Sequence, residues 1–327
     1  MKKRNLFLLF ILSILSSCRN EEQTDMSQIE ISSFNLERKC SSSEALEQRL
    51  RSSPELKNMY TKDLHEEELI EKNLESGKLI NNETVVIPVI VNVVYSNPVN
   101  NVSIDRILSQ EEVLNNTFAS TNFDIGKIPN LFKPVKAGNI KIRFTVVDFK
   151  RRKVPAQIWQ ADKDLMKTEQ YGIAATNPNK YLNIWVVDNL DQSSTGYSSL
   201  PFEHGRWYDG VVIRAVNFGV TNKNAMYGLG RTAVHEVGHY LGLKHIWGDT
   251  ACGTDNINDT PQQKNAIYGN PNFPFYTLCG GTRRVAMTMN FMNYVDDRSM
   301  YMFTRDQGNR MEYVVSARGR RSSLRTN

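Results

Sequence analysis

Strong charge, long apolar runs and histidine are all scarce in this 327-residue chain. The formal net charge is only +5, and basic residues near the two ends outnumber that excess, so the middle of the chain is slightly acidic. This distribution gives no reason to expect nucleic acid as a partner, and we predict a solvated basic tail at residues 319–327. The basic residues near the ends are Lys2, Lys3, Arg4, Arg318, Arg320, Arg321 and Arg325.

The apolar run Leu6–Leu15 is too short to span a bilayer comfortably. It follows a basic start and precedes small residues, which is the pattern of a secretory signal peptide over residues 1–17. The ending Leu15-Ser16-Ser17-Cys18 resembles a bacterial lipobox, whose cysteine is lipidated, and a plain signal peptide cut nearby is the alternative. We therefore expect an exported lipoprotein at the outer membrane or cell surface, in contact with the membrane only through its lipid.

Composition and periodicity divide the rest of the chain into a helical segment and a larger domain. Residues 41–77 are rich in Glu, Leu and Lys, which favours helices, with Ser42 or Ser43 as a cap and Pro54 opening a second helix. VVIPVIVNVVY at residues 85–95 predicts a strand, residues 103–118 a long amphipathic helix, and IKIRFTVVDF, YLNIWVVDN and GVVIRAVNF further strands. This order indicates an α/β or α+β domain over residues 81–318, preceded by a segment over residues 18–80.

Three of the five histidines lie in HEVGHYLGLKH, residues 235–245. On a helix, His235 and His239 project from one face about 6 Å apart, which suits two ligands of one metal ion. If the helix continued, His245 would lie about 9 Å further along the axis and on another face. A left-handed residue at Gly242 would end the helix and allow His245 to return to the metal. The sequence therefore predicts a zinc site with three histidine ligands.

Glu236 follows the first ligand and points too far aside to complete the metal's coordination. There it can take a proton from the attacking water and pass it to a leaving amine. Three protein ligands leave one position open, which is typical of catalytic zinc. The alternatives are histidines satisfied within a core, or a structural metal in a non-enzymatic surface lipoprotein or adhesin.

The pattern HExxHxxGxxH is that of the metzincin metallopeptidases, and NFMNYVDD downstream resembles their Met-turn, with Met292 beneath the zinc. HIWGDTACGTDNINDTP after the third histidine is similar to the pappalysin family. The resemblance extends over about residues 38–318 and implies a catalytic domain of two subdomains, with zinc at the base of the cleft and a twisted, mostly parallel sheet. It also implies that Tyr294 stabilises the oxyanion. Another metzincin family of different specificity is a rival, although Ile246 stands where astacins have Glu.

The resemblance also sorts the remaining cysteines. Cys252 and Cys279 match a family disulfide, and Ser299 stands where a second pair would have a cysteine. Cys40 corresponds to a pro-segment cysteine that blocks the zinc until the pro-segment is removed, with a surface thiol as the alternative. Ser41 replaces the glycine that usually follows this cysteine. If Cys18 carries the lipid, removal of the pro-segment would also release the mature enzyme from the membrane.

The resemblance further implies a calcium ion and a preference for basic residues. Asp255, Asp259 and Thr260 supply oxygen ligands for calcium, and a solvated acidic loop is the alternative. Relatives cut before Arg or Lys, and Asp306 is our candidate for the acidic residue of that pocket, with Asp296 and Asp297 as competitors. Lys72 and Lys78 would suit processing of the chain by the enzyme itself.

The sequence thus predicts a secreted zinc endopeptidase made as a zymogen, acting on protein or peptide substrates as a monomer. His204 lies outside the zinc motif and is expected at the surface.

Overall fold

The structure, a computed structural model, describes residues 37–75, 83–191 and 194–325. The predicted signal peptide, the lipid-bearing Cys18 and the boundary after Lys78 lie outside these residues. Within them, no helix combines the length and the apolar character needed to cross a membrane.

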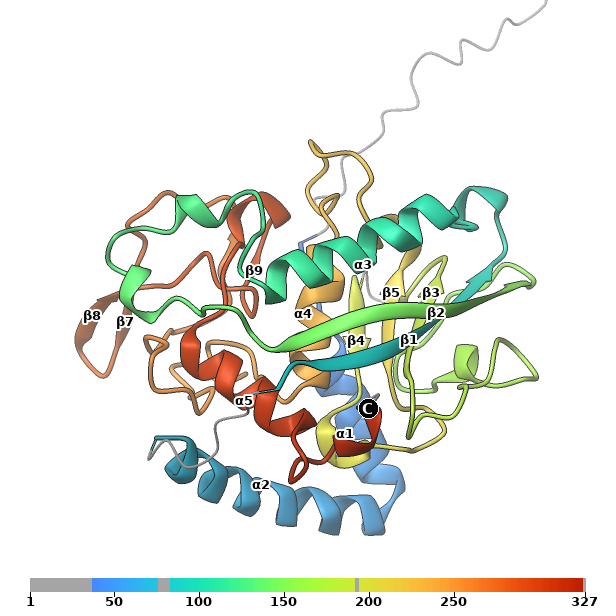
Figure 1. Ribbon diagram of the computed structural model, residues 1–327, viewed down its shortest axis with the longest axis horizontal. Coiled ribbons are helices and arrows are strands. Elements are labelled where there is room, and N and C mark those ends of the chain that lie inside the picture. The colour runs from blue at the N-terminus through green and yellow to red at the C-terminus, as the bar shows by residue number, and fades with distance from the viewer. Residues whose placement is uncertain (1–36, 76–82, 192–193, 326–327) are drawn as a thin grey trace, which may run out of the picture. The chain divides into compact units, whose positions relative to one another are not determined.

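A five-stranded sheet forms the first half of the domain (Figure 1). Its order is β2-β1-β3-β5-β4, and every neighbouring pair is parallel except β4 with β5. The predicted mostly parallel sheet is therefore confirmed. The strands are β1 (Val85–Tyr95), β2 (Ile142–Lys153), β3 (Leu182–Val187), β4 (Gly196–Ser198) and β5 (Val211–Arg214).

Alternation along the strands supplies apolar side chains to both faces of the sheet. On β3, Ile184 and Val186 join the large core cluster, whereas Trp185 and Val187 join a smaller cluster on the other face. The large cluster includes side chains of α3 (Ile104–Phe118) and α4 (Arg231–Tyr240). The hydroxyl of Ser103 accepts the N–H of Arg106 and so caps α3.

The second half of the domain follows α4 and contains little regular structure apart from α5 (Arg305–Val315). Thr304 and Gln307 form a capping box at the start of α5. Two small sheets complete this half, from β6 (Tyr268–Gly269) with β9 (Tyr294–Val295), and from β7 (Tyr276–Cys279) with β8 (Thr282–Val285). Short 3-10 helices are η1 (Pro98–Asn100), η2 (Ile125–Lys127), η3 (Lys133–Val135), η4 (Leu165–Lys167), η6 (Pro201–Glu203), η7 (Ala215–Asn217), η8 (Asp297–Ser299) and η9 (Ser322–Leu324).

The segment before β1 forms α1 (Ser42–Ser52) and α2 (Pro54–Glu75), as its composition predicts. The predicted cap is wrong by one residue: Ser41 is the N-cap and makes no side-chain capping bond. Both helices pack on the main domain, with Leu46 and Leu56 against Phe202 of η6. The helix α2 lies beside α5 (Figure 1).

The predicted solvated tail at residues 319–327 is wrong at Arg321, whose side chain is buried. Its guanidinium lies 2.8 Å from the carboxylate of Asp209 and donates to the carbonyl of Tyr240. A buried carboxylate from a distant part of the chain therefore balances this charge, which composition alone could not reveal. His204 is also more buried than expected, because its ring contacts both Asp209 and Arg321.

Candidate active site

The helix α4 ends at the position that the third histidine requires. Gly242 has a φ of +88°. Its N–H donates to the carbonyl of His239, and the N–H of Leu243 donates to that of Gly238. This pair of bonds is a Schellman motif, which closes the helix with a left-handed residue. The chain then reverses and brings His245 back toward the helix.

The three histidines meet through their Nε2 atoms, which lie 3.0 to 3.2 Å from one another. The Nδ1 atoms point outward, to the carbonyl of Phe291 at 2.7 Å, to that of Leu243 at 2.8 Å and to the carboxylate of Asp249. Because a carbonyl can only accept, the Nδ1 atoms of His235 and His239 carry the protons.

Outward Nδ1 protons leave the Nε2 lone pairs facing one another, an arrangement that a metal cation satisfies. A tetrahedral zinc with bonds of about 2.0–2.1 Å would separate its nitrogen ligands by about 3.3 Å, close to the spacing found. Burial and the neighbouring histidines hold the pKa of His235 well below its usual value, and the pKa of His239 is lowered to about 3 by burial and His245. Both imidazoles are therefore neutral, as metal ligands must be.

Cys40 supplies a fourth ligand atom at this centre. Its sulfur and the histidine nitrogens all lie within 4.8 Å of one another, and the four residues are buried. The pro-segment is held there through β4, since the N–H of Ser41 donates to the carbonyl of Gly196 at 3.1 Å. Ser41 has a φ of −97°, which any residue adopts, so the expected glycine is not needed at this position.

Glu236 is buried beside Cys40. Its Oε2 lies 3.3 Å from the sulfur of Cys40 and 3.3 Å from the hydroxyl of Ser42. Burial raises the pKa of Glu236 to about 8, although the contacts with Cys40, Arg38 and Ser42 oppose the rise. The bridging role of Ser42, which also accepts the N–H of Ser198 at 2.9 Å, was missed because serines at a helix start normally suggest a cap.

Tyr294 and Met292 flank the histidines. The hydroxyl of Tyr294 accepts the N–H of Cys40 at 3.2 Å, so the phenol reaches the peptide group that lies over the centre. The sulfur of Met292 packs against Gly238, where an added Cβ would approach to 2.5 Å. Trp247, which the sequence did not single out, stacks on His245 with ring centroids 4.4 Å apart. These contacts fix the orientation of the ligands.

A socket next to the centre holds Arg38, two residues before Cys40. We call the three residues that surround its guanidinium, Asp297, Thr232 and Tyr227, the Arg38 socket. The Nη2 of Arg38 is 2.5 Å from the carboxylate of Asp297, and its Nη1 donates to Thr232 at 3.0 Å. The ring of Tyr227 lies 4.7 Å from the guanidinium carbon. Arg38 was not predicted, and the available signal was a basic residue two positions before Cys40.

The three aspartates considered for specificity occupy different surroundings. Asp297 is buried and also accepts the N–H groups of Leu229 and Arg231. Asp296 accepts from Asn270 instead. Asp306 lies at the start of α5, and its N–H donates to Asp259 at 3.0 Å. The carboxylate of Asp306 contacts the exposed guanidinium of its neighbour Arg305, whereas that of Asp297 holds the buried guanidinium of Arg38.

In the acidic loop, two of the three expected calcium ligands, Asp255 and Thr260, contact each other. Both oxygens of Asp255 lie 2.9 Å from the hydroxyl of Thr260. Burial raises the pKa of Asp255 to about 7, and burial also raises that of Asp259. One carboxylate oxygen of Asp259 is buried without a hydrogen bond. Clustered oxygen atoms of this kind suit a hard cation such as Ca²⁺.

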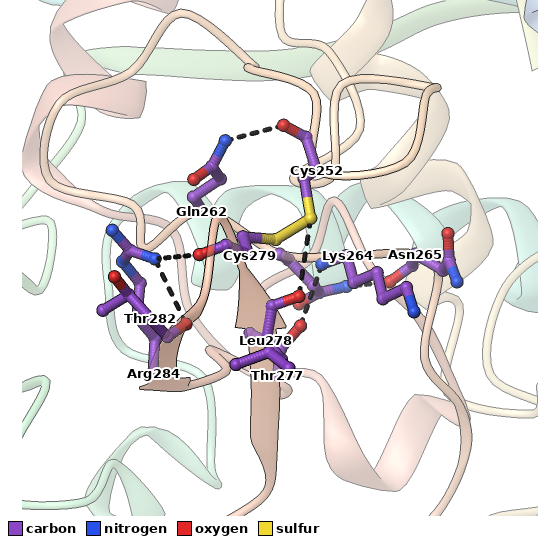
Figure 2. The surroundings of a disulfide bond; sticks show 10 residues. Cys252, Gln262, Lys264, Asn265, Thr277, Leu278, Cys279, Thr282 and Arg284 are labelled. Atoms are coloured by element: carbon purple, nitrogen blue, oxygen red, sulfur yellow. Dashed lines mark hydrogen bonds between the residues drawn. A yellow bond between two sulfur atoms is a disulfide. The ribbon is translucent and has the colours of Figure 1, made fainter.

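A disulfide joins Cys252 to Cys279, as predicted (Figure 2). The carbonyl of Cys252 accepts from Gln262 at 2.6 Å, so the acidic loop is held at its beginning. The hydroxyl of Ser299, which stands where relatives would have a second cysteine pair, donates to Asn270 at 2.8 Å.

Residues 166–316 match the family model of peptidase M43, described as pregnancy-associated plasma protein-A. The chain is 33% identical over 144 residues to the extracellular metalloprotease of Arthroderma otae, an alignment that covers 42% of this chain and 51% of that protein. It is 41% identical over 88 residues to extracellular metalloprotease 1 of Coccidioides posadasii, covering 27% and 31%. The chain thus spans about half, or less, of the length of these curated relatives.

Two solved structures match nearly their whole length. A Tannerella forsythia promirolysin mutant superimposes with a TM-score of 0.78 at 35% identity, covering 88% of this chain and 97% of that one. Mature mirolysin of the same organism, in complex with a cleaved peptide, gives a TM-score of 0.70 at 38% identity and covers 75% and 97%.

Proposed function

Because the chain belongs to the pappalysin family of metallopeptidases, we propose that it is a zinc endopeptidase made as a latent precursor. The observation that carries this proposal is the convergence of three imidazoles, Glu236 and Cys40 at one buried centre. A structural metal in a non-enzymatic adhesin does not explain a carboxylate held beside the ligands. The relatives named as extracellular metalloproteases support export of this chain as well.

Each residue of the site has a separate role in the proposed reaction. His235, His239 and His245 would hold zinc, which when bound activates water and polarises the peptide carbonyl. Glu236 takes the proton from the attacking water and delivers it to the leaving amine. The phenol of Tyr294 donates a hydrogen bond to the carbonyl oxygen of the substrate as negative charge develops on it. In the latent chain its hydroxyl contacts the backbone of Cys40, the position that a substrate peptide would take.

Latency would follow from occupation of the site by the pro-segment. With zinc bound, the sulfur of Cys40 would take the ligand position that water needs, and the contacts of Glu236 with Cys40 and Ser42 occupy the catalytic carboxylate. Removal of the segment, by cleavage near Lys72 or Lys78 as we expect, would free both groups.

Cleavage before Arg or Lys is the specificity that the Arg38 socket supports. Asp297, Thr232 and Tyr227 already bind a guanidinium in the latent chain. We therefore propose Asp297 in place of Asp306 as the acidic residue of the pocket for the residue after the scissile bond. The neighbour of Asp306 is instead Asp259, which we propose as a calcium ligand with Asp255 and Thr260.

We also propose that Cys18 anchors the precursor to the membrane and that the mature monomer is shed when the pro-segment leaves. Fractionation of cells that express the chain would test this proposal. The lipid should remain with the membrane while the catalytic domain appears in the medium. Active catalytic domain that stays with the membrane after complete processing would contradict it.

The test of the activity is cleavage mapping by mass spectrometry. Residues 19–327 would be incubated with a peptide library, beside the Glu236→Ala variant and a chelator-treated sample. Cuts before Lys and Arg that disappear in both controls are the expected result. Chelator-sensitive cuts at other sequences would retain the mechanism and overturn the assigned pocket. No cleavage, even after an added protease has removed the pro-segment, would overturn the peptidase itself.

A further inference from the structure

A second arginine of the pro-segment lies in an acidic socket away from the metal centre. Arg49 of α1 is buried, with its Nη1 3.4 Å from Asp164 and its Nε 3.1 Å from Glu203. The ring of Tyr208 lies 4.7 Å from its guanidinium carbon. We call Asp164, Glu203 and Tyr208 the Arg49 socket. All three belong to the main domain, so the socket remains when the pro-segment leaves.

Arg49 is the cation in ion-pair contact with Glu203 among the described residues, while Lys167 and Arg321 act on this carboxylate from farther away. Lys167 is buried with its Nζ 2.8 Å from Asp164, and it compensates that carboxylate from within the main domain. Glu203 is completely buried, and one of its oxygens accepts the N–H of Leu200. Its Oε1 faces Arg49 without a hydrogen bond from the described residues. Loss of Arg49 would leave Glu203 without its contacting cation, which is costly in a buried site.

The pairing is electrostatically strong despite the burial of Arg49. Burial lowers the pKa of its guanidinium, but Glu203 and Asp164 more than offset this effect and the pKa is raised. A cavity of about 290 Å³ adjoins the Arg49 socket. Arg206 stands at its rim, but its side chain is 31% exposed, so water screens its charge far more than that of Glu203.

Along the chain, Arg38 precedes Cys40 and Arg49 follows it in α1. Cys40 stands between the two arginines, and α1 continues along β4 toward Glu203. A substrate whose basic residue after the scissile bond enters the Arg38 socket must extend its preceding residues the other way. Those residues would run along the edge of β4 toward the Arg49 socket.

We propose that the Arg49 socket is a second subsite, which in the processed enzyme binds a basic side chain on the N-terminal side of the scissile bond. This inference rests on the proposed peptidase function and on removal of the pro-segment. The preferred substrates would then carry two basic residues, one directly after the cut and one several positions before it. Each would replace an arginine of the pro-segment.

Position-scanned peptides test the subsite. All peptides carry Lys after the cut, and Arg replaces Gln at one position at a time on the N-terminal side. The processed enzyme comes from cleavage of the folded full chain. We expect kcat/KM to rise about tenfold at one position or two adjacent ones, as a charge-assisted contact allows. In Glu203→Gln, the ratio of kcat/KM with Arg to kcat/KM with Gln at that position should fall close to one. Asp105→Asn, which removes an exposed charge that does not line this cavity, should retain the effect.

A binding measurement separates failure of the subsite from failure of the peptidase. Calorimetry with processed Glu236→Ala should show about tenfold weaker binding when Gln replaces the scanned Arg. If Glu203→Gln fails to fold, Tyr208→Leu removes the aromatic wall and should lower the same ratio. A wild-type enzyme without the preference, or a preference that survives both substitutions, overturns the subsite. Absence of cleavage with retained Arg-dependent binding would overturn the peptidase and leave the subsite standing.

Discussion

At the scale of single residues, Arg38 of the pro-segment indicates which aspartate is the better candidate for the specificity pocket. Asp297 and Asp306 are only nine positions apart in the sequence, yet Asp297 lies against Arg38 and Asp306 against the acidic loop. The pair of Arg38 and Asp297 lies beside the metal centre, and this place supports the proposed pocket for basic residues.

Asp297→Asn should therefore reduce kcat/KM for cleavage before Arg by about 10- to 100-fold, the value of one charged hydrogen bond. The amide keeps the size of the side chain but loses the charge. Asp306→Asn is the matched control and should retain the preference. Kinetics of both variants on peptides with Arg or Leu after the cut would measure the effect, and an equal loss in both variants would contradict the assignment.

The buried pair of Arg321 and Asp209 makes the free energy of unfolding depend on pH in the acidic range. Burial raises the pKa of Asp209, but Arg321 lowers it more, and the net pKa is well below the usual range. A depressed folded-state pKa means that the unfolded chain binds the proton more readily. The stabilisation is therefore complete above about pH 4 and declines as the pH falls toward the folded-state pKa.

Asp209→Asn should cost about 3–5 kcal/mol at pH 6, because Arg321 then stays buried without a carboxylate. The difference from wild type should narrow below pH 4, by at most about 1.4 kcal/mol per pH unit. Urea unfolding of both proteins from pH 6 to pH 3 measures this difference. A difference that is constant across the range would show that the charge of Asp209 does not stabilise the fold.

The proximity of His235 and His239 could be predicted at this scale because a helix repeat relates them over four positions. The partner of Arg38 could not, since Asp297 lies 259 positions away and only folding brings them together. Arg321 was misjudged for the same reason, because its partner Asp209 is 112 positions away.

At the scale of elements, the end of α4 determines whether the third ligand reaches the metal. Gly242→Ala would place a Cβ 3.1 Å from Val314 and 3.3 Å from Pro201, at a φ of +88°. We expect a cost of about 1–2 kcal/mol for the left-handed conformation and a displaced His245. The variant should melt lower and lose zinc at lower chelator concentrations.

Gly138→Ala is the control, because no atom lies within 4 Å of the added Cβ. Thermal unfolding and zinc retention under chelator titration would compare the two variants. Equal zinc retention in both would contradict the assigned role of the turn.

Long elements were predictable because they carry periodic patterns, as β1 and α3 do. The edge strand β4 was not predictable, since three residues are too few to show alternation. Its antiparallel pairing with β5 becomes evident only in the fold. The cap of α1 was misplaced because Ser42 bonds Glu236 instead of its own helix.

At the scale of the whole molecule, the disulfide constrains the half of the domain with the least regular structure. Its cysteines are 27 positions apart, a loop whose closure is worth about 3–4 kcal/mol on chain-entropy grounds. Reduction should lower the free energy of unfolding by that amount and loosen the acidic loop. Urea unfolding with and without reductant measures the change, and a Cys252→Ser, Cys279→Ser double variant should not respond to reductant.

The pro-segment contacts the main domain at several separate points. Arg38, Cys40 and Arg49 enter its sockets, and Arg320 pairs with Asp63 of α2 at 3.2 Å. Simultaneous contacts on one tethered segment raise the effective concentration of each, so none has to be strong alone. A cut in the connection before β1 would leave every one of these contacts intact. The nicked protein would stay catalytically inactive until the segment dissociates or is itself degraded. A delay would therefore separate the cut from the first turnover.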